Sequence, residues 1–162
     1  MATEESKRIE GKVLAARSRL LAAAEGLDNE GWEWRPDHNA WSVRLTLAHV
    51  GSAQWDHLQV VHRLITGEPA ALPDFDLDTW NAAAVEQRAE WPVAQVLADL
   101  EAAQEATVAL LHSLDDEALA VTGTHPALGE VSVQQVLRII PLHDNLHRRD
   151  IRKLRKAMDR KE

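Results

Sequence analysis

Apolar residues fall into stretches with the period of an amphipathic helix. The first stretch ends near Gly26 and repeats apolar residues at steps of three and four, at Ile9, Val13, Ala16, Leu20, Ala23 and Leu27. The second begins after Ser42, a residue typical of the position before a helix, and runs to about Thr66, where Gly67 and Pro69 end it. The pattern therefore predicts two long helices in the first part of the chain.

Two further helices are predicted in the second part of the chain. One covers residues 79–114 and is broken near Trp91, because Pro92 suits the first turn of a new helix. The other begins after Ser132, with Gln135 three residues later in a capping-box pattern, and runs to about Ala157. We expect one all-α domain over residues 1–162, a four-helix bundle with long loops at 28–41, 67–78 and 115–131.

The composition agrees with helices and limits the chemistry. Tyr is absent, Phe occurs once and Gly seven times, whereas Ala and Leu are abundant. The chain contains no Cys, which excludes disulfides, thiolate metal sites and a cysteine nucleophile. Any thiol chemistry would therefore need a thiol supplied from outside.

The charge is uneven along the chain. The formal net charge is −8, but residues 148–162 carry +5 and the residues before them −13. An acidic body argues against a nucleic-acid partner, and the basic run reads best as the solvated face of the last helix. Because the sequence has no signal-peptide core and no apolar segment of membrane-spanning length, we expect a cytoplasmic protein without a membrane partner.

Three histidines are predicted to face the interior of the bundle. On a helical wheel His147 lies about 40° from His143, in the middle of the apolar stripe of the last helix. His49 lies in the middle of the stripe of the second helix. They are either core histidines bonded to backbone carbonyls, such as that of Leu137, or ligands of one metal ion that satisfies all three at once. Their number favours the metal.

Two aspartates are candidates for a role beside these histidines. Asp56 lies about 10.5 Å along the helix from His49, which suits substrate binding better than metal ligation. Asp150 lies about 4.5 Å beyond His147 and could orient that imidazole through its free N–H. The alternative for both is a solvated or arginine-paired carboxylate.

Most other aromatic residues are expected to be structural. Trp32, Trp34 and Trp41 should pack in the core, whereas Trp55 falls on the polar side of its helix and indicates a partner surface, for instance in a homodimer. The remaining histidines are expected at the surface, namely His38, His57, His62, His112 and His125.

Five segments spread over residues 9–155 form a recognisable series, namely "WSVRLTLAHV", "DTWNAAA", "SLDDEAL", "VSVQQVL" and "HDNLHRRDI". Their order and spacing resemble the DinB-like superfamily of metal-binding four-helix bundles, which includes bacterial thiol-dependent S-transferases and maleylpyruvate isomerases. The resemblance implies a divalent ion, namely zinc, nickel or manganese, held by one ligand from the second helix and two from the fourth. Those positions are His49, His143 and His147.

Three functions are compatible with such a site. The first is a metal-dependent transferase or isomerase that activates an external low-molecular-weight thiol toward a small-molecule substrate. The second is a metal-dependent hydrolase that uses bound hydroxide, with Asp56 or Asp150 as candidate acid or base. The third is a non-catalytic stress or binding protein. The sequence leaves open which of these applies and whether the protein is an enzyme.

Overall fold

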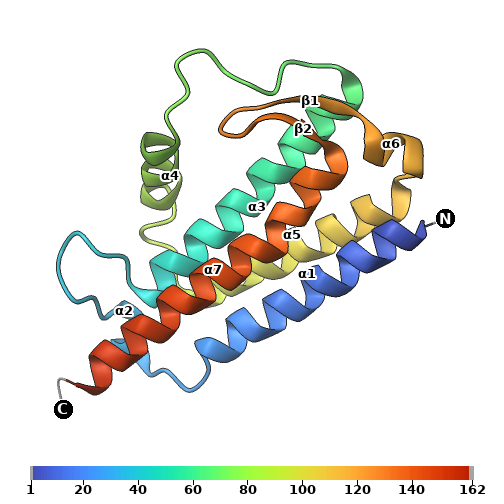
Figure 1. The fold of residues 1–162 in the computed structure, drawn as a ribbon. Coiled ribbons are helices and arrows are strands. Elements are labelled where there is room, and N and C mark those ends of the chain that lie inside the picture. The colour runs from blue at the N-terminus through green and yellow to red at the C-terminus, as the bar shows by residue number, and fades with distance from the viewer. Residues whose placement is uncertain (1, 161–162) are drawn as a thin grey trace.

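The computed structural model describes residues 2–160, and four long helices form its body (Figure 1). They are α1 (Glu4–Ala23), α3 (Val43–Thr66), α5 (Val93–Ser113) and α7 (Val133–Asp159). α7 packs against α1 and α3, and α5 packs against the same two helices from the other side. The predicted all-α four-helix bundle is confirmed.

The helices run in an uncommon order of directions. α1 and α7 run in one direction, while the consecutive helices α3 and α5 both run in the other (Figure 1). The segment between α3 and α5 must therefore carry the chain back along the length of the bundle. It contains α4 (Leu77–Glu86), which lies beside α3 outside the bundle. The crossover places a wall of residues over one face of α3.

The long helices begin and end where the sequence predicts. Ser42 accepts a hydrogen bond from the backbone N–H of Leu45, and Gly67 ends α3 with a left-handed φ of 73°. Ser132 and Gln135 form the complete capping box at the start of α7. The break near Trp91 is also present, although Pro92 precedes the first turn of α5 rather than lying in it.

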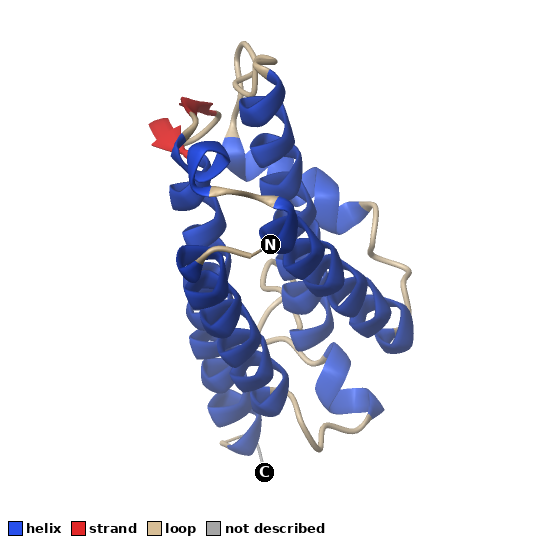
Figure 2. Cartoon of the chain, turned by 90° about the vertical axis from the view of Figure 1, so that its right-hand side faces the viewer, coloured by secondary structure: helices blue, strands red, loops and turns tan. Residues whose placement is uncertain are grey.

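The loops contain more structure than predicted. The first holds α2 (Asn29–Glu33), and residues 115–131 hold α6 (Asp116–Ala120) and most of an antiparallel hairpin of β1 (Thr122–His125) and β2 (Gly129–Ser132). The hairpin lies at one end of the bundle, against α3 and the start of α7 (Figure 2). The prediction of a plain connecting loop was wrong because four-residue strands are too short to show a clear alternating pattern.

A polar layer crosses the core between two apolar clusters. Arg17 of α1 pairs with Asp144 of α7, with 2.8 Å between Nε and Oδ2, and both side chains are almost fully buried. The Arg17 guanidinium also donates to the Leu100 carbonyl of α5 and to the Gln54 side chain of α3. This layer joins all four helices. Its Asp144 directly follows His143 in the sequence.

Among the helices within residues 2–160, none combines the length with the apolar character that a membrane span requires.

Candidate metal centre and adjoining pocket

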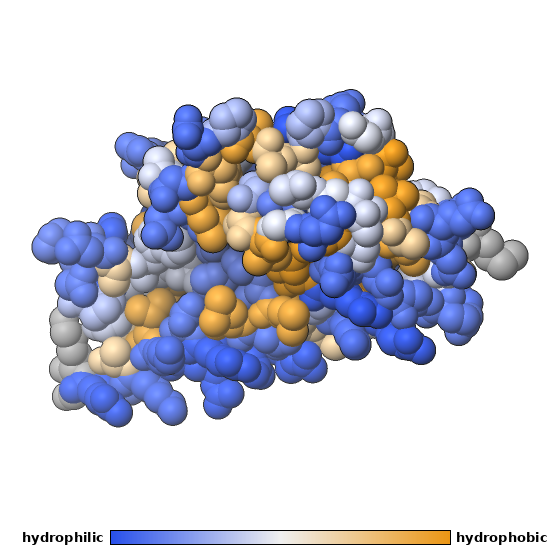
Figure 3. Space-filling model, turned by 45° about the horizontal axis from the view of Figure 1, so that its top comes forward, coloured by the Kyte–Doolittle hydropathy of each residue, from blue (hydrophilic) through white to orange (hydrophobic). Residues whose placement is uncertain are grey.

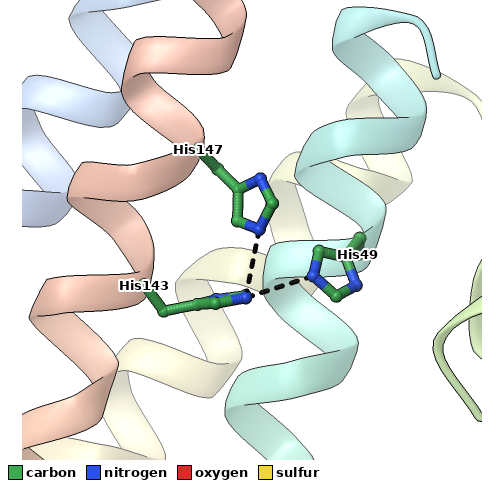
Figure 4. Close-up of side chains that lie close together, drawn as sticks. All are labelled: His49, His143 and His147. Carbon is green, nitrogen blue, oxygen red and sulfur yellow. Dashed lines mark hydrogen bonds between the residues drawn. The ribbon is translucent and has the colours of Figure 1, made fainter. Parts of the chain in front are cut away.

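Three histidine side chains converge between α3 and α7 (Figure 4). His49 comes from α3, and His143 and His147 come from successive turns of α7. The Nε2 atom of His143 lies 3.1 Å from the Nε2 atoms of both His49 and His147. One nitrogen of each ring lies within 4.8 Å of the others. The structure therefore brings together the three residues that the sequence predicts as ligands.

Burial keeps these imidazoles in the neutral form. Burial, together with the neighbouring histidines, lowers the pKa of His49 to about 3 and that of His143 to about 2. Burial also lowers the pKa of His147, against the opposing charge of Asp150. A neutral imidazole has a free lone pair on one nitrogen, which is the form that binds a metal ion.

Hydrogen bonds alone leave this cluster poorly satisfied. An imidazole nitrogen carries either one proton or one lone pair, so Nε2 of His143 can make a good hydrogen bond to only one of its two neighbours. Nδ1 of His49 is also buried without a partner among the described residues. Two nitrogens bound to one tetrahedral zinc lie about 3.3 Å apart, close to the two 3.1 Å separations from Nε2 of His143. The donor set thus fits a single divalent ion.

The two candidate aspartates lie near the cluster in different ways. Oδ2 of Asp150 lies 3.1 Å from Nδ1 of His147, a close contact that is not aligned as a hydrogen bond. Oδ2 of Asp56 instead accepts a 2.8 Å hydrogen bond from Nε1 of Trp80 on α4. Burial raises the pKa of Asp56, and the Trp80 bond opposes that rise. Asp150 is therefore beside the cluster, and Asp56 joins α4 to α3.

A mostly apolar cavity of about 250 Å³ opens beside the cluster. Its walls come from α3, the crossover segment, the hairpin and α7, and apolar side chains gather on this end of the molecule among polar ones (Figure 3). The residues that line it include His49, Asp56, His57, Val60, Leu72, Phe75, Leu77, Trp80, His125, Leu128, Ile139 and His143. We call it the apolar pocket; two candidate ligands form part of its lining.

Two histidines expected at the surface line this pocket instead. His125 is 8% exposed, and its Nδ1 accepts the backbone N–H groups of Ala127 and Leu128 in the hairpin turn. Its ring centre lies 5.8 Å from that of His57, which lies 6.4 Å from that of His143. Burial lowers the pKa of His57 to about 4. His57 is 80° from His49 on the wheel, at the edge of the buried stripe, and that signal could have found it.

The remaining aromatic predictions have mixed outcomes. Trp41 is half-buried, with its ring centre 4.9 Å from that of His49. Trp55 is half-buried too, because its Nε1 donates a 3.0 Å hydrogen bond to Oδ1 of Asp99 on α5. It is not the exposed ring predicted, so the homodimer stays a prediction without that support. His38, His62 and His112 are exposed, as expected.

Sequence comparison connects the chain with a known family. The model of the DinB superfamily matches residues 13–151. A protein of Oceanobacillus iheyensis, named as a candidate metal-dependent hydrolase, is 25% identical over 130 residues, which are 80% of this chain and 73% of the relative.

Structural comparison finds the same fold in proteins of low sequence identity. YfiT from Bacillus subtilis, described as a probable metal-dependent hydrolase with an unusual four-helix bundle topology, superposes with a TM-score of 0.78 at 18% identity, covering 98% of this chain and 90% of YfiT. The colibactin self-resistance protein ClbS, solved in complex with double-stranded DNA, has a TM-score of 0.75 at 13% identity, covering 93% and 95%. At such identities the likeness shows the fold, and the absence of a nucleic-acid partner stays a prediction.

Proposed function

The chain belongs to the DinB superfamily, and on that premise we propose that it binds one divalent metal ion through His49, His143 and His147 and uses it to act on a small, largely apolar molecule. The observation that carries the proposal is the convergence of three neutral imidazoles at the end of an apolar pocket. A divalent ion held by neutral ligands keeps its full charge and activates a bound water or thiol at its open positions.

The residues of the chain have separate tasks in this proposal. His49, His143 and His147 hold the ion, and the Asp150 carboxylate, 3.1 Å from Nδ1 of His147, favours this orientation of the ring by its charge. The apolar pocket binds the substrate and removes water from it, which strengthens the electrostatic interactions at the reacting end. Asp56 holds α4 in place through Trp80, so its role is to shape the pocket.

Hydrolysis is supported by the names of the Oceanobacillus and Bacillus proteins. Transfer of an external thiol to an electrophile is compatible with two features of this chain. The absence of Cys means that any thiol comes from outside, and the uncharged ligand set leaves the ion with the charge that stabilises a thiolate. The metal is zinc, nickel or manganese in either case.

Metal content tests the site. Protein purified without chelators or a His tag should carry about one equivalent of divalent metal by mass spectrometry, and His143→Ala should lose it. The matched control is His112→Ala, which removes an exposed histidine of α5 and should keep the metal. Metal-free, well-folded wild type that also fails to bind added zinc, nickel or manganese would overturn the proposal.

Activity screens then separate the reactions. Hydrolysis should release p-nitrophenol from small aryl esters without added thiol, whereas thiol transfer should consume 1-chloro-2,4-dinitrobenzene only when L-cysteine or glutathione is present. Loss of either activity in His143→Ala ties it to the metal. Metal-loaded protein that is inactive in both screens but binds small apolar molecules would favour the non-catalytic binding protein.

A further inference from the structure

The hairpin turn holds His125 in one orientation and one tautomer. Its Nδ1 accepts the backbone N–H of Ala127 at 3.0 Å and that of Leu128 at 3.2 Å. A nitrogen that accepts hydrogen bonds carries a lone pair, so the single proton of the neutral ring is on Nε2. Burial lowers the pKa of His125, which keeps the ring neutral. His125 therefore presents an N–H donor whose direction the backbone fixes.

The Nε2–H group of His125 has no acceptor among residues 2–160, because both hydrogen bonds of the side chain involve Nδ1. The polar side-chain atoms that are sealed from solvent without a partner belong to other residues, so Nε2 can be reached from the apolar pocket that the ring lines. The residue is otherwise almost fully buried, with 8% of its surface exposed. A ligand in the apolar pocket is thus the acceptor within reach.

Other donors in the lining of the pocket are already in use. Nε1 of Trp80 donates to Asp56, and the Arg63 guanidinium donates to the Pro69 carbonyl at 3.2 Å. Two of the histidines in the lining belong to the candidate metal centre. In a mostly apolar pocket the few polar groups that remain available decide how a ligand is oriented. The N–H of His125 is such a group.

His125 lies apart from the candidate metal centre. Its ring centre is 5.8 Å from that of His57, which is 6.4 Å from that of His143. His57 is thus next to both rings, and all three residues line the same pocket. A ligand that meets the metal centre and His125 together needs two functional groups, one for each place.

We propose that His125 is a specificity-determining residue of the apolar pocket, where its Nε2–H donates a hydrogen bond to a carbonyl oxygen of a small apolar ligand. This rests on the apolar pocket as the proposed substrate site and deepens it by naming the class of substrate. The substrate carries an acceptor oxygen on the hairpin side of the pocket, apart from the group that reacts. An ammonium group has no lone pair to accept the N–H and cannot take this place.

NMR of protein labelled with ¹⁵N-histidine tests the donor directly. Two-bond ¹H–¹⁵N correlations distinguish the tautomers, and His125→Asn assigns the signals by removing them. The wild type should carry the His125 proton on Nε2. The matched probes are acetophenone and α-methylstyrene, in which a C=CH2 group replaces the carbonyl. Acetophenone should move the Nε2–H proton signal downfield by more than α-methylstyrene does, because only the ketone accepts a hydrogen bond.

A substitution that keeps the turn tests the recognition. In His125→Asn the amide oxygen can accept the same backbone N–H groups, as in an Asx turn, but the shorter side chain does not reach the place of Nε2. The variant should weaken acetophenone binding about two- to tenfold, the share of one ordinary hydrogen bond, and leave α-methylstyrene binding unchanged. His62→Asn, which replaces an exposed histidine of α3 outside the pocket, should change neither.

The outcomes separate this inference from the metal site. A wild-type proton on Nδ1 of His125 would overturn it, and so would equal losses of both probes in His125→Asn while the amide signals of Ala127 and Leu128 stay in place. If the variant loses the hairpin, the wild-type tautomer and the two wild-type titrations decide. Both titrations are run with and without zinc, so failure of the metal site leaves the result standing, whereas a pocket that binds neither probe overturns this inference and leaves the metal site untouched.

Discussion

Replacing Arg17 by methionine should destabilise the protein more than any surface change, because it leaves Asp144 buried without its cation. The Arg17 and Asp144 side chains are 4% and 2% exposed, so water cannot take the place of the lost partner. The substitution also removes the donors to the Leu100 carbonyl and the Gln54 side chain. Breaking a buried ion pair at one partner costs about 3–5 kcal/mol. For a chain of this size that is a fall in Tm of roughly 6–20 °C.

The pH dependence of the loss provides a second readout. Burial raises the pKa of Asp144, and Arg17 partly opposes the rise, so the variant should raise it further. A carboxyl group with a raised pKa in the folded state destabilises the protein at high pH, and this is relieved as the pH falls and the group is protonated. The difference in stability between Arg17→Met and wild type should therefore shrink as the pH is lowered.

Urea and thermal unfolding monitored by circular dichroism would measure both effects. Lys7→Met is the control, because Lys7 pairs with Glu4 on the exposed face of the same helix and its loss should not be measurable. The double variant Arg17→Met/Asp144→Leu should recover much of the stability, since it leaves no buried charge. A loss below about 1 kcal/mol for Arg17→Met, or one that grows as the pH falls, would refute the reasoning.

Three further predictions follow from the structure. The metal-free protein should lose stability as the pH falls below about 6.5, because histidines of the unfolded state take up protons there. His49 and His143 of the folded state do not, since their pKa values are lowered to about 3 and about 2. The free energy of unfolding, measured between about pH 4 and about pH 8, should therefore change less with pH in His143→Gln than in wild type. Ser132→Ala should cost about 1 kcal/mol by urea unfolding, because it removes the capping box of α7. Gly123→Ala should cost about 1–3 kcal/mol, because its new Cβ would lie 2.5 Å from Cδ2 of Leu64; wild-type stability would show that the hairpin moves freely there.

The long helices and the three histidines could be predicted from sequence because their signals are local and periodic. His143 and His147 share a helix face because they are four residues apart, and the capping-box pattern at Ser132 predicts where their helix begins. His49 could be added because it too lies on an apolar stripe. Whether these residues bind a metal stays a prediction.

Contacts between residues far apart in the chain could not be predicted from the sequence. Arg17 and Asp144 are 127 residues apart, and nothing in the sequence of the first helix identifies the partner that lets its Arg17 be buried. His125 was assigned to the surface because its four-residue strand has no recognisable pattern, although the hairpin turn fixes its ring through two backbone N–H groups. The directions of α3 and α5 were equally invisible, since a linker's composition does not state where it leads.

The crossover between α3 and α5 tolerates substitutions that the bundle helices do not. Within the described chain, Val85 is the one buried residue of α4, whereas α3 buries residues along most of its length. Changes at exposed positions of the crossover thus cost little folding free energy, yet Leu72, Phe75, Leu77 and Trp80 supply one wall of the apolar pocket. Substitutions in that wall can therefore change which small molecules the pocket accepts, while the bundle and its three histidines stay unchanged.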